Sequence, residues 1–168
     1  MRLFIAVNFS EDMIAGLVYL RDRLRSCSTG GGFTPPENMH LTLAFIGECD
    51  DNQANAVKAA MDNVTLKPIE VTVDRVGCFP GGIWWAGVRP DNNLLEVQKE
   101  LTRKLTDAGF RLDSRPYTPH ITLGRQVVTD ARPYEVEPFG EAAFSIELMK
   151  SEFIRGRVVY TPIYSKHI

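Results

Sequence analysis

Apolar and polar residues alternate along several short stretches of the chain, the pattern of β-strands that bury one face. Residues 69–73 and 144–148 alternate in this way, and residues 3–7 form a continuous apolar run that is typical of a fully buried strand. Residues 83–88 and 158–164 predict two further strands. Strands are therefore expected over the whole length of the chain.

Apolar residues at helical spacing predict three amphipathic helices between these strands. The first follows an N-cap at Ser10 and runs to about Arg25, the second is capped by Asp50 or Asp51, and the third closes near Gly109. The inner faces comprise Met13, Leu17, Leu20 and Leu24 in the first helix, Ala54, Val57, Met61 and Val64 in the second, and Leu94, Val97, Leu101 and Leu105 in the third.

The glycine run at 30–32 and the proline-containing stretch at 132–138 predict loops. The predicted order is then β-α-β-α-β-β-α-β-β-β. Because strands lead into hairpins as well as into helices, this order predicts an α+β fold with mostly antiparallel sheet. We expect one domain over residues 1–168, built as two closely packed lobes.

One four-residue pattern occurs twice. Residues 40–43 read His-Leu-Thr-Leu, and residues 120–123 read His-Ile-Thr-Leu. Two of the three histidines in the chain begin this pattern. On a strand, the histidine and the threonine project from one face and the two aliphatic residues from the other. Two such strands, the first expected over 39–46, would together present two imidazoles and two hydroxyls if they faced each other.

The bulk composition restricts the classes of function. The chain has 168 residues, 44% hydrophobic and 24% charged, with a formal net charge of −2. This balance argues against a broad basic surface that grips long nucleic acid, but leaves room for a small phosphate site. Three widely spaced cysteines and a short apolar start predict reduced thiols in a cytoplasmic protein without a membrane anchor.

The repeated residues suit chemistry at phosphorus. Imidazole titrates near neutral pH, so His40 and His120 can act as an acid/base pair, while Thr42 and Thr122 can donate hydrogen bonds to phosphoryl oxygens. Arg125 lies five residues after His120, and a bend at the preceding glycine would turn its guanidinium toward the phosphate.

Phe45 holds the matching position after the first motif, where core packing is expected ahead of stacking on a base. Trp84 and Trp85 should face opposite sides of one strand, with one of them in the core. Arg155 and Arg157 either line a groove for an RNA end or form an exposed edge. His167 is expected to have no function.

With both motifs in place, the chain resembles the two-histidine (2H) phosphoesterases, and within them the RNA 2′,3′-cyclic phosphodiesterases, also called 2′-5′ RNA ligases. The segments 36–48, 119–125 and 155–160 carry the resemblance together with residues 2–4. It implies two lobes whose motif strands face each other across a central cleft, with helices outside.

The resemblance also implies an activity. A terminal 2′,3′-cyclic phosphate of RNA would be opened to a 2′-phosphate without a metal or other cofactor, and a reverse reaction would form 2′-5′ linkages. His40 would be the acid for the leaving O3′ and His120 the base for water, while Thr42, Thr122 and Arg125 would hold the phosphate. The expected partners are RNA 3′ ends bearing this group, with no membrane partner, and the protein is expected to be a monomer.

Three alternatives stay open. The protein could act on another cyclic phosphate or on a 2′-5′ linkage. It could bind RNA ends without catalysis. It could also be a metal-dependent hydrolase in which both histidines are ligands, although no third ligand stands at a recognisable spacing.

Overall fold

The computed structural model describes residues 1–168 and has the predicted α+β architecture. The helical segments are α1 (Glu11–Ser26), a 3₁₀ turn η1 (Pro36–Asn38), α2 (Asp51–Asp62) and α3 (Asn92–Asp107). The strands are β1 (Arg2–Val7), β2 (Ser28–Phe33), β3 (Leu41–Glu48), β4 (Ile69–Phe79), β5 (Ile83–Val88), β6 (His120–Thr129), β7 (Tyr134–Ala143), β8 (Ser145–Ile154) and β9 (Arg157–His167).

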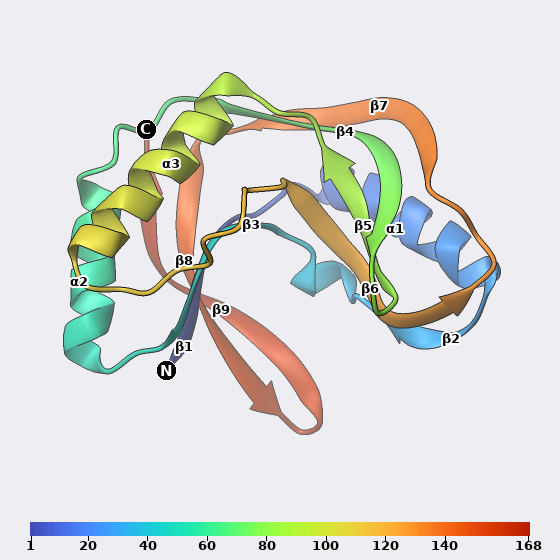
Figure 1. Ribbon diagram of the computed structural model, residues 1–168, viewed down its shortest axis with the longest axis horizontal. Helices are drawn as coiled ribbons and strands as arrows, with labels where there is room; N and C mark the ends of the chain where they lie inside the picture. The colour runs from blue at the N-terminus through green and yellow to red at the C-terminus, as the bar shows by residue number, and fades with distance from the viewer.

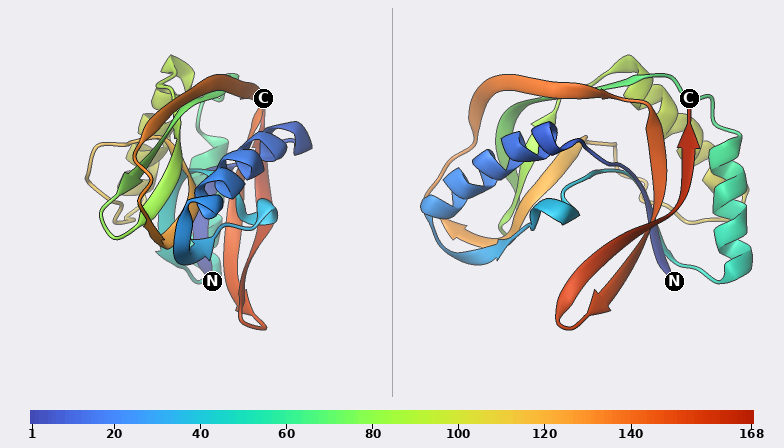
Figure 2. Two further views of the ribbon diagram at one scale, coloured as in Figure 1. Left: turned by 90° about the vertical axis from the view of Figure 1, so that its right-hand side faces the viewer. Right: turned by 180° about the vertical axis from the view of Figure 1, so that it is seen from behind.

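Two antiparallel sheets form two lobes (Figure 1). The first has the strand order β3-β1-β8-β9, and the second has the order β2-β6-β5-β4-β7. Helices α2 and α3 cover the outside of the first lobe, and α1 lies along the outside of the second (Figure 2). The prediction of mostly antiparallel sheet with outer helices is therefore confirmed. None of the helices combines the length and the apolar character needed to cross a membrane.

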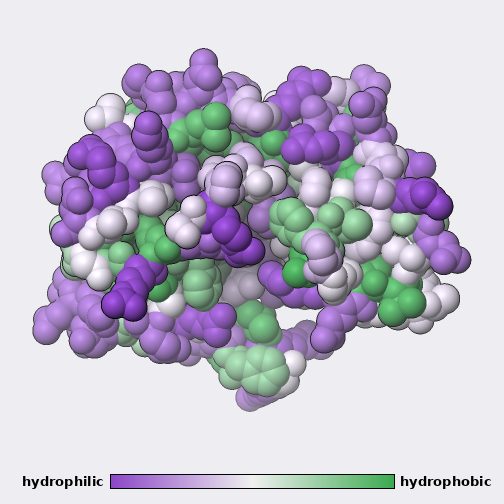
Figure 3. All heavy atoms as spheres, viewed as in Figure 1, coloured by the Kyte–Doolittle hydropathy of each residue, from purple (hydrophilic) through white to green (hydrophobic).

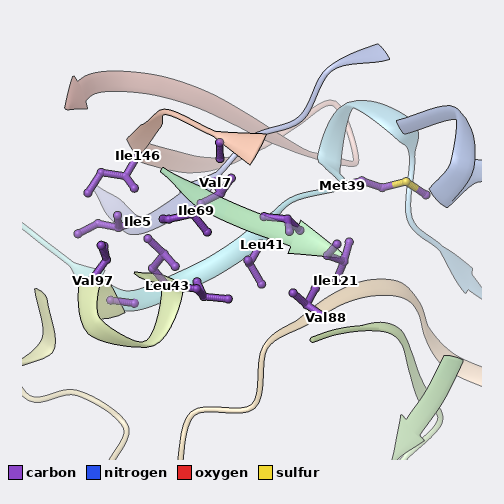
Figure 4. Close-up of a cluster of buried hydrophobic side chains, with 14 of the residues drawn as sticks. Ile5, Val7, Met39, Leu41, Leu43, Ile69, Val88, Val97, Ile121 and Ile146 are labelled. Atoms are coloured by element: carbon purple, nitrogen blue, oxygen red, sulfur yellow. The ribbon is translucent and has the colours of Figure 1, made fainter. Parts of the chain in front are cut away.

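One hydrophobic core runs through both lobes. Ile5 and Ile146 belong to the first sheet, Val88 and Ile121 to the second, and all four lie in one continuous cluster with Leu41 (Figure 4). All four residues predicted for the inner face of each helix are buried. The N-caps are also as predicted, because Ser10 accepts from the amide of Met13 and Asp50 forms a capping box with Gln53.

Two predicted loops are wrong. Residues 30–32 belong to β2, which pairs with β6, and most of the stretch 132–138 belongs to β7, which pairs with β4. Both strands lie at an edge of the second sheet. An edge strand tolerates proline because one side needs no ladder hydrogen bond. The glycines of β2 also serve packing, since a Cβ at Gly31 would lie 2.8 Å from the backbone of Val127.

Two strand boundaries also differ from the prediction. The first motif strand was expected over 39–46, but β3 begins at Leu41, so that His40 lies just before it. Phe144 was expected inside the following alternating strand, yet β8 begins at Ser145 and Phe144 is 58% exposed.

Candidate active site

The two motif strands contact each other through the hydrophobic core. Leu41 lies between His40 and Thr42, and Ile121 lies between His120 and Thr122; both aliphatic side chains are fully buried in the shared cluster (Figure 4). Since neighbouring strand residues point to opposite faces, each histidine and threonine is directed away from this core. In Figure 3 the surface is hollowed between the two lobes.

Each motif strand carries a β-bulge after its threonine. In β3, Ala6 pairs with Thr42 and Ile5 with Ala44, so Leu43 is an extra residue. In β6, the register shifts by one residue between Thr122 and Gly124. An extra residue reverses which face the following side chains occupy.

Each bulge brings the residue five positions after the histidine onto the face of the strand that carries the histidine and threonine, which we call the histidine face. Arg125, which a regular strand would direct toward the core, is therefore exposed on the same face as His120. Its charge lowers the pKa of both His40 and His120. Phe45 is likewise 49% exposed, with the Arg2 guanidinium 5.0 Å from its ring centre. The predicted core role of Phe45 is wrong, because the bulge at Leu43 turns the ring outward.

Both imidazoles are oriented in the same way. The Nδ1–H of His40 donates to the carbonyl oxygen of Asn38 at 2.8 Å, and that of His120 donates to the carbonyl of Thr118 at 2.6 Å. A carbonyl can only accept, so Nε2 is the nitrogen of each ring that is free to exchange a proton. The Nε2 of His40 lies 2.9 Å from the hydroxyl oxygen of Thr42.

Aromatic rings hold each imidazole from the sides. His40 lies 4.8 Å from the ring of Phe4 and 5.2 Å from that of Tyr160, between ring centres. His120 lies 5.0 Å from Phe79 and 6.4 Å from Trp85. These four rings restrict both imidazoles and remove water from around them.

Sequence reasoning missed the role of these aromatic residues, because they come from strands β1, β4, β5 and β9. The prediction that one tryptophan of the pair is core and the other faces away is confirmed, with Trp84 only 4% exposed. Trp85 pairs with Thr122 of the neighbouring strand β6, so its ring lies on the histidine face.

Burial is the largest influence on both histidines. It lowers the pKa of His40 and of His120 below the ordinary value, because the charged ring loses solvation. The backbone carbonyls of Asn38 and Thr118 oppose this shift by stabilising the protonated rings. Arg125 lowers both pKa values further, and His120 also lowers that of His40. In the absence of an anion, both imidazoles therefore favour the neutral form near pH 7.

A direct hydrogen bond also joins the segment before β6 to β3. The Tyr117 hydroxyl donates to the carbonyl oxygen of Thr42 at 2.8 Å, and burial raises the tyrosine pKa. This bond connects the two motifs, because Thr42 follows His40 while Tyr117 precedes His120 by three residues. His167, by contrast, is exposed at the end of β9.

The structure thus places His40, Thr42, His120, Thr122 and Arg125 on the histidine faces of two neighbouring strands. No group of three or more His, Cys, Asp or Glu side chains lies together in a way that could hold a metal ion. The site offers two imidazoles, two hydroxyls and one guanidinium, a set suited to proton transfer beside an anion.

Two antiparallel lobes that each contribute one His-x-Thr-x strand define the architecture of the two-histidine phosphoesterases. The chain belongs to the 2′-5′ RNA ligase superfamily, whose family model matches residues 18–160. A relative from Archaeoglobus fulgidus, named RNA 2′,3′-cyclic phosphodiesterase, is 30% identical over 84% of this chain and 85% of its own length. Relatives of the same name from Methanocaldococcus jannaschii and Escherichia coli are 29% and 28% identical, and cover 97% and 96% of this chain and 98% and 93% of their own lengths.

Solved structures share the fold. The chain superposes on TT0787 of Thermus thermophilus with a TM-score of 0.88 at 25% identity, covering 99% of this chain and 97% of the other. Escherichia coli LigT, in a complex with 3′-AMP, gives a TM-score of 0.87 at 24% identity with the same coverage.

Proposed function

We propose that this protein opens the terminal 2′,3′-cyclic phosphate of RNA to a 2′-phosphomonoester by acid/base catalysis with His40 and His120. The observation that carries the proposal is the pair of matched imidazoles, each held through Nδ1 by a backbone carbonyl so that Nε2 remains for proton transfer. The relatives named RNA 2′,3′-cyclic phosphodiesterase support the choice of substrate.

The proposed reaction is a displacement at phosphorus. Nε2 of His120 takes a proton from water as its oxygen forms the new bond to phosphorus, and Nε2–H of His40 gives a proton to O3′ as the P–O3′ bond breaks. The products are a 2′-phosphate and a free 3′-hydroxyl, and proton exchange with solvent restores both rings. The reverse transesterification, with a 5′-hydroxyl in place of water, would form a 2′-5′ linkage.

The proposed roles fit the electrostatics of the site. An acid must be protonated when substrate is bound, and the negative charge of a cyclic phosphodiester beside His40 would raise its lowered pKa. Arg125, together with the hydroxyls of Thr42 and Thr122, would then hold the non-bridging oxygens. Burial first, and the charge of Arg125 in addition, lower the pKa of His120 and so favour the neutral ring that a base requires.

The test is an assay of product chemistry in EDTA. A short RNA ending in a 2′,3′-cyclic phosphate is incubated with wild type, His40→Ala and His120→Ala, with His167→Ala as the matched control because that histidine is exposed. We expect a 2′-phosphate from wild type and the control alone.

Each other outcome identifies a different function. A 3′-phosphate product would mean that the P–O2′ bond is broken in place of P–O3′, and would contradict the roles assigned to His40 and His120. Loss of turnover in EDTA, restored by a metal, would identify a metal-dependent hydrolase. Binding of the RNA without turnover would identify an RNA-end binding module, and turnover of other cyclic phosphates or of 2′-5′ linkages alone would change the substrate.

A further inference from the structure

The β8–β9 hairpin projects from the first lobe, away from the body of the molecule (Figures 1 and 2). Its turn is formed by Arg155 and Gly156, which both have positive φ, at 51° and 78°. The two strands next to this turn are apolar yet exposed: Phe153 is 75% exposed and Val158 is 41% exposed. Phe153 is the most exposed of the large hydrophobic side chains, and a second exposed apolar residue pairs with it.

The register of the hairpin places these residues on the histidine face of the sheet. Phe153 pairs with Val158, and the next pair on the same face is Ser151 with Tyr160. The Tyr160 ring lies 5.2 Å from that of His40. Two residues along a strand span about 7 Å. The Phe153–Val158 pair is therefore one step further out than the ring that contacts His40.

A hydrogen bond fixes the hairpin relative to the candidate acid. The Asn38 side-chain amide donates to the carbonyl oxygen of Val158 at 3.0 Å. The backbone carbonyl of the same Asn38 accepts from Nδ1–H of His40 at 2.8 Å. One residue thus holds both the imidazole and the backbone of the exposed apolar pair.

The charges of the hairpin suit a polyanion. Arg155 and Arg157 are exposed at its turn. Glu152 pairs with Val159, so it lies on the opposite face from Phe153, and its carboxylate is 3.6 Å from the amine of Lys150. The face that carries Phe153 therefore has no carboxylate between the turn and Tyr160. Proteins that bind single-stranded nucleic acid without base selection stack the bases on exposed aromatic rings and hold the backbone with nearby cations.

We propose that the Phe153–Val158 pair is a stacking platform for the nucleotide that precedes the one bearing the terminal phosphate. This inference rests on the proposed function, because it assumes that the phosphate lies between His40 and His120. The preceding base stacks on Phe153, and its phosphate lies near Arg155. The substrate is then a single-stranded oligonucleotide end and not a free cyclic mononucleotide.

The test separates binding from turnover. Dissociation constants are measured for an adenosine mononucleotide and an adenosine trinucleotide, both ending in a 2′-phosphate. This group is the product of the proposed reaction, so binding is measured without turnover. We expect wild type to bind the trinucleotide more tightly. Phe153→Ala should reduce the ratio of the two affinities by roughly 5- to 100-fold, the value of one base–aromatic stack, while Phe153→Trp should keep it.

Two matched variants serve as controls. Phe144→Ala removes another exposed ring, which lies just before β8, and Ile154→Ala removes an exposed apolar side chain from the other face of the hairpin. Neither should change the ratio. Arg155→Gln should weaken binding of the trinucleotide and make its affinity less dependent on salt.

Several results would overturn the inference. One is a ratio of trinucleotide to mononucleotide affinity that is unchanged in Phe153→Ala, and another is loss of this ratio in Phe45→Ala instead. A third is conversion of a dimer to a monomer by Phe153→Ala in sedimentation, which would identify a second copy of the chain as the occupant. Turnover of a trinucleotide ending in a cyclic phosphate is measured in parallel. Absence of turnover with a ratio that still depends on Phe153 would reject the proposed function and keep the platform.

Discussion

Strands β3 and β6 share a local structure that their sequences only hint at. In both, the six residues that begin at the histidine follow the same burial order: histidine and threonine half-buried, the aliphatic residues and the next residue buried, and the sixth exposed. Both carry a bulge after the threonine, and both hold Nδ1 of the histidine by the carbonyl two residues earlier. The backbone geometry of the site is thus present twice.

The side chains around the two histidines differ. The exposed sixth residue is Phe45 in β3 and Arg125 in β6, so only the second motif supplies a cation at this position itself. Nε2 of His40 also lies within hydrogen-bond distance of the Thr42 hydroxyl. The charges around the two rings are also unequal, because Arg125 lowers the pKa of both histidines while His120 lowers that of His40 in addition.

The largest expected effect comes from removing either imidazole. We expect His40→Ala and His120→Ala each to lower kcat by about 10²–10⁴-fold, because each removes one half of the proton transfer. The double variant should lose little more than the more damaged single variant, because the two rings act as a unit. Steady-state assays with an RNA ending in a cyclic phosphate measure this. Fully multiplicative losses would show that the rings act independently.

Exchanging the cation tests the asymmetry directly. Arg125→Gln should lower kcat/KM by about 10–100-fold, since a charge-assisted hydrogen bond to phosphate is worth roughly 1.5–3 kcal/mol. Phe45→Ala should have a clearly smaller effect, although it holds the matching position. Arg111→Gln, at another exposed arginine, is the matched control for charge. Equal losses at positions 45 and 125 would mean that the two sides of the site are equivalent.

The link between the motifs should contribute modestly to stability. Tyr117→Phe removes the hydrogen bond to the carbonyl of Thr42, which corresponds to a loss of about 1 kcal/mol in the free energy of unfolding. Tyr19→Phe is the control, because that side chain is 67% exposed. Thermal or urea unfolding measures the difference. A stability equal to that of wild type would show that the bond does not hold the motifs together.

The smallest expected effect is a shift with pH. Both histidines have folded pKa values below the unfolded value of about 6.5, so near and below this pH the unfolded chain binds more protons. Their contribution to stability is complete above the unfolded pKa and is lost as the pH falls through the folded values.

Arg125 lowers both of these pKa values, so Arg125→Gln should raise them toward the unfolded value. The pH profile of kcat/KM should then shift toward alkaline pH, and the loss of stability on acidification that comes from His40 and His120 should become smaller. Activity assays and urea unfolding across a pH series measure the two effects. A profile that stays in place would mean that the guanidinium is too far from the rings to act on them.

Much of the fold could be predicted from local pattern. The helix faces, the caps at Ser10 and Asp50 and the strand Ile83–Val88 follow from spacing and turn residues alone. Strand β2 could not, because its glycines carry no apolar pattern and it exists only through hydrogen bonds to β6. Strand β7 was hidden by Pro133 just before it and by Pro138 inside it, which is tolerated because β7 is an edge strand and its pairing with β4 is irregular between Glu135 and Phe139.

The site shows the same division. The sequence by itself determined the five polar residues, because a repeated His-x-Thr-x pattern and a nearby arginine are local features of the chain. Only the tertiary structure decided that Phe45 and Arg125 lie on the same strand faces as the histidines, since one extra residue in a strand pair reverses the faces of the side chains that follow it. It also decided that Phe4, Tyr160, Phe79 and Trp85 surround the imidazoles, because contacts between distant strands depend on sheet pairing and leave no periodic trace in the sequence.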